Sequence, residues 1–109
     1  MLLLMKRGYA LLPSVVQYID GVVAESLITS FDERRLNGYR WNKVSEVAAQ
    51  QALLEPANRP GSAIPILSLD YWGSGDTDTN KEIYARERRN GYCPYVGTPL
   101  LNTIVPEPS

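Results

Sequence analysis

The feature that most constrains this 109-residue chain is the spacing of proline in its last sixteen residues. Prolines occupy positions 94, 99, 106 and 108, and apolar residues fill most of the spaces between them. Because proline lacks a backbone N–H and fixes φ, this segment can form neither a long helix nor a central strand. Its apolar content is also unlike that of a solvated linker. We therefore predict a compact body in residues 1–93 and an extended C-terminal arm in residues 94–109 that lies against an apolar surface.

Length and composition restrict the class of protein. A chain of this length forms one domain, and its apolar fraction of 44% is ordinary for a globular protein. The net charge of −1 provides no field that attracts nucleic acid or an anionic membrane. No run of 18 apolar residues exists, and Met1–Arg7 places apolar residues before basic ones, the reverse of a signal peptide. We expect a cytoplasmic protein or a component of an assembled particle, with no membrane contact and no recognisable signal peptide.

The chain contains no histidine, and Cys93 is its only cysteine. Histidine is the side chain that most often transfers protons near neutral pH, and it is also the commonest metal ligand. A single cysteine can form neither an intrachain disulfide nor a thiolate zinc site. The 12 acidic residues show no spacing that singles out a pair for glycosidase chemistry. The sequence therefore predicts a protein that is not an enzyme and uses no cofactor.

Hydrophobic periodicity predicts helices in the first half of the chain. Apolar residues at intervals of three and four favour a helix over residues 14–29, although β-branched residues also permit a strand over Gly21–Phe31. That strand would lead into a hairpin turn at Asn37-Gly38, since both residues tolerate positive φ. A second helix is predicted over Asn42–Leu54, with Asn42 as its cap, and Pro56 ends it.

The second half of the chain predicts a strand and a further helix. Residues 63–72 read as a strand that either lies at a sheet edge or enters the sheet after Pro65. A helix is predicted over residues 80–89, with Gly91 in the left-handed position after its last turn and an ion pair between Glu82 and Arg86. We therefore predict an α+β fold: a small single domain with two to three helices, a few short strands and extended arms at both ends.

Residues 76–87 permit two interpretations. In these twelve residues the chain resembles the EF-hand family, and the resemblance implies a calcium-binding module. The ligands would be Asp76, Asp78, Asn80 and Glu87. However, Lys81 occupies the position where that loop needs glycine, and no helix is predicted before the loop. The favoured interpretation is a helix capped by Thr79, with Glu82 reaching back in a capping box.

Apolar and aromatic residues late in the chain predict contacts with other proteins. An aromatic pair beside a glycine-rich turn is typical of an interface anchor, and the arm needs an apolar surface to cover it. The candidate interface residues are Tyr71, Trp72, Tyr92, Tyr95, Leu100, Leu101, Ile104 and Val105. Nucleic acid is an unlikely partner because acids interleave with the basic and aromatic clusters.

These features together predict a structural subunit that packs against neighbouring chains in a homo- or hetero-oligomer. A connector, cement or tail accessory protein of a viral particle would have this organisation. The alternatives are a small monomeric binding or inhibitory protein that acts on one partner, and the calcium-binding module.

Overall fold

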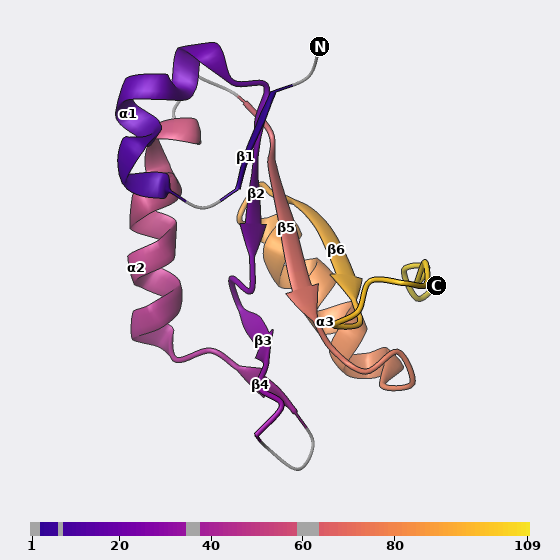
Figure 1. The fold of residues 1–109 in the computed structure, drawn as a ribbon. Helices are drawn as coiled ribbons and strands as arrows, with labels where there is room; N and C mark the ends of the chain where they lie inside the picture. Colours follow the sequence, from indigo (N-terminus) through magenta and orange to yellow (C-terminus); the bar gives the residue numbers. More distant parts are fainter. Residues whose placement is uncertain (1–2, 7, 35–37, 59–63) are drawn as a thin grey trace.

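The computed structural model describes residues 3–6, 8–34, 38–58 and 64–109. Within them the chain is a small single domain with three α-helices and six strands, which confirms the predicted mixture of helices and short strands. Four strands form a parallel sheet in the order β1-β2-β5-β6 (Figure 1). Their bounds are β1 (Leu4–Lys6), β2 (Gly21–Glu25), β5 (Ile66–Tyr71) and β6 (Cys93–Gly97). Nothing in the sequence patterns predicts that these strands are parallel.

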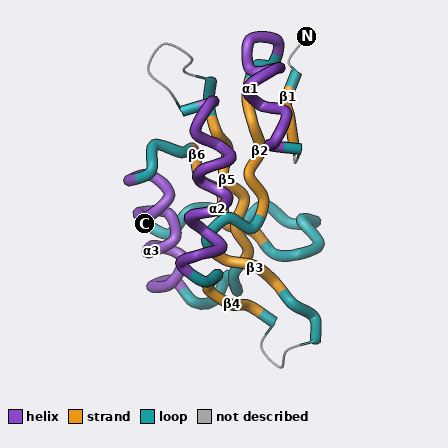
Figure 2. The backbone as a smooth tube through the Cα atoms, turned by 90° about the vertical axis from the view of Figure 1, so that its left-hand side faces the viewer, coloured by secondary structure: helices purple, strands orange, loops and turns teal. Residues whose placement is uncertain are grey.

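Helices connect each pair of neighbouring parallel strands. They are α1 (Leu12–Val15), α2 (Val44–Leu54) and α3 (Thr77–Arg89). Because strand order follows chain order and such crossovers are right-handed, all three helices lie on the same face of the sheet. Figure 2, viewed from the side of α1 and α2, shows α2 in front of the strands. None of the helices in the described part of the chain is long and apolar enough to cross a membrane.

The core lies between the helices and this covered face. Val22, Ala24 and Ile66 point from the sheet into it and are almost completely buried, together with residues of all three helices. The next residues along the strands point to the opposite face, because side chains alternate along a strand. There Val23 is half-buried and Leu67 is exposed. The sheet is therefore packed on one face and open on the other within the described residues.

The predicted helix over residues 14–29 is wrong beyond Tyr18. The helical part is short: the 3₁₀ helices η1 (Tyr9–Leu11) and η2 (Val16–Tyr18) flank α1. The chain then enters β2 at Gly21, where an added Cβ would lie 3.1 Å from the Leu4 side chain and 3.2 Å from the Pro65 carbonyl oxygen. Gly21 is thus a close approach between strands, and the β-branched residues after it fill a buried parallel strand.

The hairpin that the alternative strand prediction implied is present after β2. The strands β3 (Thr29–Phe31) and β4 (Tyr39–Trp41) pair antiparallel, with Phe31 opposite Tyr39. Gly38 adopts φ 82°, as the predicted turn requires, while Asn37 lies outside the described residues. The hairpin extends beyond the carboxyl end of β2 (Figure 1).

The predicted second helix is confirmed as α2, with a shifted start. Lys43 is the N-cap residue, and its backbone N–H donates to the Glu46 carboxylate over 2.9 Å. Asn42, the predicted cap, instead donates its side-chain amide to the carbonyl oxygens of Ser26 and Leu27. The 3₁₀ helix η3 (Glu55–Ala57) continues from the end of α2, and residues 59–63 lie outside the described residues, including the first residue of the strand predicted over 63–72. The chain resumes in β5, which enters the sheet after Pro65 and occupies a central position.

The third helix begins three residues earlier than predicted. Asp76, not Thr79, is the N-cap residue, and its carboxylate accepts a hydrogen bond from the Thr79 backbone N–H over 3.2 Å. The predicted end is confirmed, since Gly91 has φ 84°. The Gly91 N–H donates to the Arg88 carbonyl, and the Tyr92 N–H donates to the Glu87 carbonyl. These two bonds form a Schellman motif. The predicted ion pair between Glu82 and Arg86 is also present, at 2.8 Å.

The predicted arm is divided by the structure. Its start at residue 94 falls inside β6, so residues 94–97 belong to the sheet, and only residues 98–109 lie beyond the last strand. This remainder folds back on the body. The Val105 N–H donates to the Tyr95 hydroxyl over 3.1 Å, and Glu107 forms an ion pair with Arg88 of α3.

Candidate functional site

The carboxyl ends of the parallel strands define the candidate site. In parallel α/β sheets and in (β/α) barrels, ligands bind at this edge because the strand-to-helix loops converge there. Glu25 is the last residue of β2, and its side chain points to the open face with 21% of its surface exposed. It is therefore a carboxylate on a rigid element, with its Oε2 atom buried and another part of its side chain exposed.

Side chains from the two neighbouring strands hold Glu25 in place. The Tyr71 hydroxyl of β5 donates to the Glu25 Oε1 atom over 2.6 Å. On the other side, the Lys6 ammonium of β1 lies 2.9 Å from the Glu25 Oε2 atom. Both contacts favour the ionised carboxylate over the neutral acid. Tyr71 is 7% exposed, so its ring is fixed by packing and its hydroxyl is a preorganised donor.

The backbone turns sharply just after Glu25. Ser26 adopts φ 56°, an uncommon conformation for a residue with a side chain, and its N–H donates to the Leu69 carbonyl over 2.7 Å. The Asp70 carboxylate accepts the backbone N–H groups of Ile28 and Thr29 over 3.0 Å and 3.1 Å. The loop that follows Glu25 is therefore tied to β5 through a backbone carbonyl, that of Leu69, and a side-chain carboxylate, that of Asp70.

A pair of carboxyl groups, separate from Glu25, lies on the helix-covered face of the sheet. Glu25 is aligned with Leu69 of β5, so the next residue, Asp70, points to the helix-covered face. There Asp70 and Glu87 of α3 are both fully buried. Burial, the larger cause, and the neighbouring Asp70 together raise the pKa of Glu87 to about 9. This pair is shielded from solvent and attaches α3 to the sheet, so it cannot contact a substrate directly.

Four aromatic rings form a continuous row along the hairpin and the loop after β5. The ring centroids of Phe31 and Tyr39 are 5.2 Å apart. Trp72 lies 5.7 Å from both Tyr39 and Trp41, and the Arg86 guanidinium stacks on Trp41 at 4.7 Å. Trp72 directly follows Tyr71 in the sequence, and the contact of Trp41 with Arg86 joins the row to α3 on the helix-covered side of the sheet.

Two of the hollows in the described part of the chain lie at the turn end of this hairpin. One, of about 380 Å³, lies between the hairpin and the segment after β6. It is lined by Phe31, Glu33, Tyr39, Thr98, Pro99, Leu100 and Asn102. The other, of about 500 Å³, is lined by Ser30, Phe31, Asp32, Glu33, Arg34 and Arg40.

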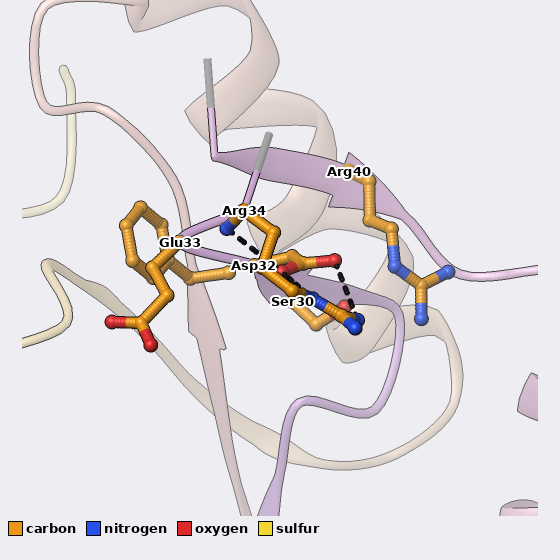
Figure 3. Close-up of a pocket in the computed structure, with 6 residues that line it drawn as sticks. Ser30, Asp32, Glu33, Arg34 and Arg40 are labelled. Atoms are coloured by element: carbon orange, nitrogen blue, oxygen red, sulfur yellow. Dashed lines mark hydrogen bonds and ion pairs between the residues drawn. The ribbon is translucent and has the colours of Figure 1, made fainter. Parts of the chain in front are cut away.

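In the larger of these two hollows, most of the charged side chains are already paired. Figure 3 shows the Asp32 carboxylate facing Arg34. The backbone N–H and the guanidinium of Arg34 both donate hydrogen bonds to this carboxylate. The pKa of Arg34 is raised by this hydrogen bond to Asp32. Arg40 is paired with Glu46 at 3.3 Å. The charged groups of this hollow are thus mostly engaged with each other.

The structure does not bring the predicted calcium ligands together. Asp76 caps α3 and also accepts the Trp72 indole N–H, while the Asn80 side chain donates to the carbonyl oxygens of Gly73 and Asp76. Glu87 lies under the sheet, separated from the start of the helix by almost its full length. Asp78 is exposed in the first turn. Among the described residues, no three acidic, cysteine or histidine side chains are arranged to hold a metal ion.

The predicted interface residues fall into three groups by burial. Tyr71 and Tyr92 are buried within this chain, whereas Leu100, Leu101 and Ile104 are exposed. Trp72, Tyr95 and Val105 are half-buried. A contact of the exposed group with another protein remains a prediction.

Glu25 was missed as a site residue, although the sequence contains a signal for it. The apolar run Gly21–Ala24 ends in an acid, and the run Ile66–Leu69 likewise ends in Asp70-Tyr71. An acid at the end of a buried strand is what a site at the carboxyl edge of a parallel sheet requires. The signal becomes visible only when these runs are interpreted as parallel strands.

Two solved structures match the chain over 99% of its length. One is the glycoside hydrolase domain of PelA from Pseudomonas aeruginosa, with a TM-score of 0.81 and 26% sequence identity. The other is a variant of that domain in which one glutamate is replaced by alanine, with a TM-score of 0.81 and 25% identity. The chain spans 42% of the length of these domains. No protein-family model and no curated protein sequence matches it.

These matches correct the predicted function. The similarity is to a carbohydrate-related enzyme domain, so the prediction of a structural subunit of a viral particle was wrong. The two alternatives, a small monomeric binding or inhibitory protein and a calcium-binding module, also describe a different kind of protein. The error arose from the C-terminal segment, whose prolines and apolar residues indicated an arm, whereas its first part is a strand of the sheet. The sequence predicted no enzyme, but both matched structures are glycoside hydrolase domains.

Proposed function

We propose that this chain belongs to a carbohydrate-active hydrolase domain and that Glu25 is a catalytic carboxylate acting at the glycosidic bond. The observation that carries the proposal is the position of Glu25, held by Lys6 and Tyr71 at the carboxyl edge of a parallel sheet. The similarity to a glycoside hydrolase domain over nearly the whole chain supports it. Consecutive parallel strands with helices on one face are also the local arrangement of (β/α) barrels, whose active sites lie at this edge.

The contacts of Glu25 indicate which role it plays. Glycoside hydrolysis generally uses two carboxyl groups, one that donates a proton and one that acts in its ionised form as nucleophile or base. The Tyr71 hydroxyl and the Lys6 ammonium both stabilise the ionised form of Glu25. We therefore assign Glu25 to the second role. Glu87 has the raised pKa of a proton donor but is fully buried, so it is not the partner that protonates the leaving group.

The test is hydrolysis of a panel of α- and β-linked polysaccharides composed of hexoses, N-acetylhexosamines or hexosamines, measured as the release of reducing ends. We expect cleavage of at least one member. Glu25→Gln keeps the side-chain shape but removes the charge, and we expect it to lower kcat by about a thousandfold. Tyr71→Phe removes only the hydroxyl donor, so a smaller loss of kcat is expected.

Asp78→Asn is the matched control because Asp78 is an exposed acid in the first turn of α3, a helix that covers the face of the sheet opposite to the one on which Glu25 lies. It should cleave at the rate of the unmodified chain. Equal rates for the Glu25→Gln and Asp78→Asn proteins would contradict the role of Glu25. An unmodified chain that is folded and neither cleaves nor binds any member of the panel would contradict the proposal as a whole.

A further inference from the structure

We propose that the hollow of about 380 Å³ between the hairpin and the segment after β6 is a sugar-binding subsite that accepts one pyranose unit of the substrate chain. The inference rests on the proposed function and deepens it, because it assigns a recognition site at the same edge of the sheet as the carboxylate. Its volume lies within the roughly 300–1,000 Å³ of pockets that bind small molecules.

The location of the hollow connects it to Glu25. Its first wall, Phe31 and Tyr39, comes from the hairpin that follows β2, and Glu25 is the last residue of β2. Its second wall begins at Thr98, directly after Gly97, which is aligned with Tyr71 across the β5–β6 pair. Both walls therefore extend from strands whose carboxyl ends form the candidate site. A polysaccharide bound at Glu25 would reach the hollow along the same edge.

The lining has the composition that a sugar ring requires. One face of a pyranose presents C–H groups, which pack against the electron-rich face of an aromatic ring, while its hydroxyl groups project outward and need polar partners. Phe31, Tyr39 and Leu100 provide apolar and aromatic surface, and Phe31 and Leu100 are 40% and 81% exposed. Thr98, Asn102 and Glu33 provide a hydroxyl, an amide and a carboxylate at the rim. A purely apolar ligand would leave these polar groups without a partner.

Packing holds the aromatic wall in a fixed position. An added Cβ at Gly38 would lie only 2.2 Å from the Phe31 ring, so glycine is required beneath that ring. Tyr39 is held by ring contacts on both sides, to Phe31 and to Trp72. A rigid wall loses little conformational entropy when a ligand binds, which favours recognition.

The other hollow on the hairpin is a weaker candidate. Its acidic and basic side chains pair with each other, and a ligand would have to break those pairs before it could bind. The aromatic and polar surfaces of the proposed subsite face a ligand without that cost.

The test uses the full chain and the polysaccharide that it cleaves in the panel described above. Tyr39→Ala removes the stacking ring, and Leu100→Ala shortens an exposed side chain without disturbing the core. We expect each to raise KM with little change in kcat, by about tenfold for Tyr39→Ala and less for Leu100→Ala, because the lost contact is equally present in the ground and transition states. Tyr39→Phe keeps the ring and should restore KM. Tyr18→Ala is the control, since Tyr18 is 67% exposed on η2.

The outcomes separate this inference from the proposed function. If Glu25→Gln abolishes cleavage while Tyr39→Ala and Leu100→Ala leave KM unchanged, the subsite is wrong and the catalytic proposal stands. If the chain cleaves nothing but binds hexameric oligosaccharides from the panel, and both substitutions weaken that binding, the subsite stands and the hydrolase proposal fails. If the chain neither cleaves nor binds, both fail.

Discussion

At the scale of single residues, burial decides what an acidic side chain does in this protein. Glu25 and Glu87 are both glutamates, yet the side chain of Glu25 is 21% exposed and paired with Lys6, whereas Glu87 is fully buried. Removing a carboxylate from water disfavours its charged form, and the negative charge of Asp70 adds to this effect. The raised pKa of Glu87, about 9, follows from these two causes.

This pKa predicts how stability depends on pH. Between the unfolded value of 4.5 and about 9, the folded chain retains a proton on Glu87 that the unfolded chain releases. The free energy of unfolding therefore falls as pH rises through this window, by at most about 1.4 kcal/mol per pH unit from this group. The contribution is fully present below pH 4.5 and lost above pH 9. The groups that face Glu87 are Asp70, Ser68, Asn90 and Tyr92.

Glu87→Gln tests the effect because the amide has the shape of the protonated acid and does not titrate. We expect thermal midpoints close to those of the unmodified chain at pH 5 and clearly higher at pH 8. Glu82→Gln, on the exposed side of the same helix, controls for general charge effects. If the difference between the Glu87→Gln and unmodified midpoints is the same at both pH values, Glu87 is not protonated in the fold.

The same contrast explains why the spacing of some acidic residues permitted the alternative interpretation as a calcium-binding loop. Asp76 and Glu87 were candidate calcium ligands because their spacing matches a loop. Spacing does not report that residues 77–89 form a helix whose inner side places Glu87 beneath β5. The capping function of Asp76 could have been predicted from the sequence, since an acid before a helix is a common cap.

At the scale of elements, local sequence patterns predicted a helix correctly where they include residues that typically end a helix. The end of α3 was predicted because Gly91 suits the left-handed position and the last turn is rich in arginine. β2 was predicted as helix because its valines continue the spacing of the short helices before it. A parallel strand buried on one face by helices has no alternating pattern strong enough to override that spacing. The information that decides between them is the pairing of β2 with β1 and β5, which is not local.

The end of α3 provides a quantitative prediction. Gly91 has φ 84°, and an added Cβ would meet nothing closer than the Asn58 side chain at 3.9 Å. Gly91→Ala should therefore cost only the conformational energy of the left-handed region, about 1–2 kcal/mol. Gly75→Ala is the matched control because it has no positive φ and no atom within 4 Å of the added Cβ. Urea unfolding should show a loss for the first and none for the second, and equal midpoints would contradict the left-handed cap.

At the scale of the whole molecule, the chain order of the sheet determines where a site can form. Four parallel strands in sequence order, with their helices on one face, place the residues after β2, β5 and β6 along one edge. Sequence patterns predicted some of these segments separately: the hairpin turn, a strand that covers β5, and an apolar C-terminal stretch. Their convergence at one edge of the sheet could not be predicted, because it depends on parallel pairing between distant residues, such as Glu25 with Leu69 and Tyr71 with Gly97.

The two parts of the C-terminal segment should respond differently to deletion. β6 pairs along β5, buries Val96 to 1% exposure, and accepts the Trp72 N–H at the Gly97 carbonyl. Residues 98–109 are anchored mainly by the exposed contacts of Val105 and Glu107. Exposed ion pairs contribute little to stability, whereas a lost strand exposes core and unpaired backbone groups.

A chain that ends at Gly97 should therefore keep its circular dichroism spectrum and a cooperative thermal transition. A chain that ends at Tyr92 should lose both, because α3 would no longer have a strand to cover beside β5. Oligosaccharide binding gives the second measurement: the chain that ends at Gly97 lacks Thr98 and Leu100, so it should fold but bind weakly. A folded chain that ends at Tyr92 would show that β6 is dispensable and that the compact body does end near residue 93, as the sequence alone predicts.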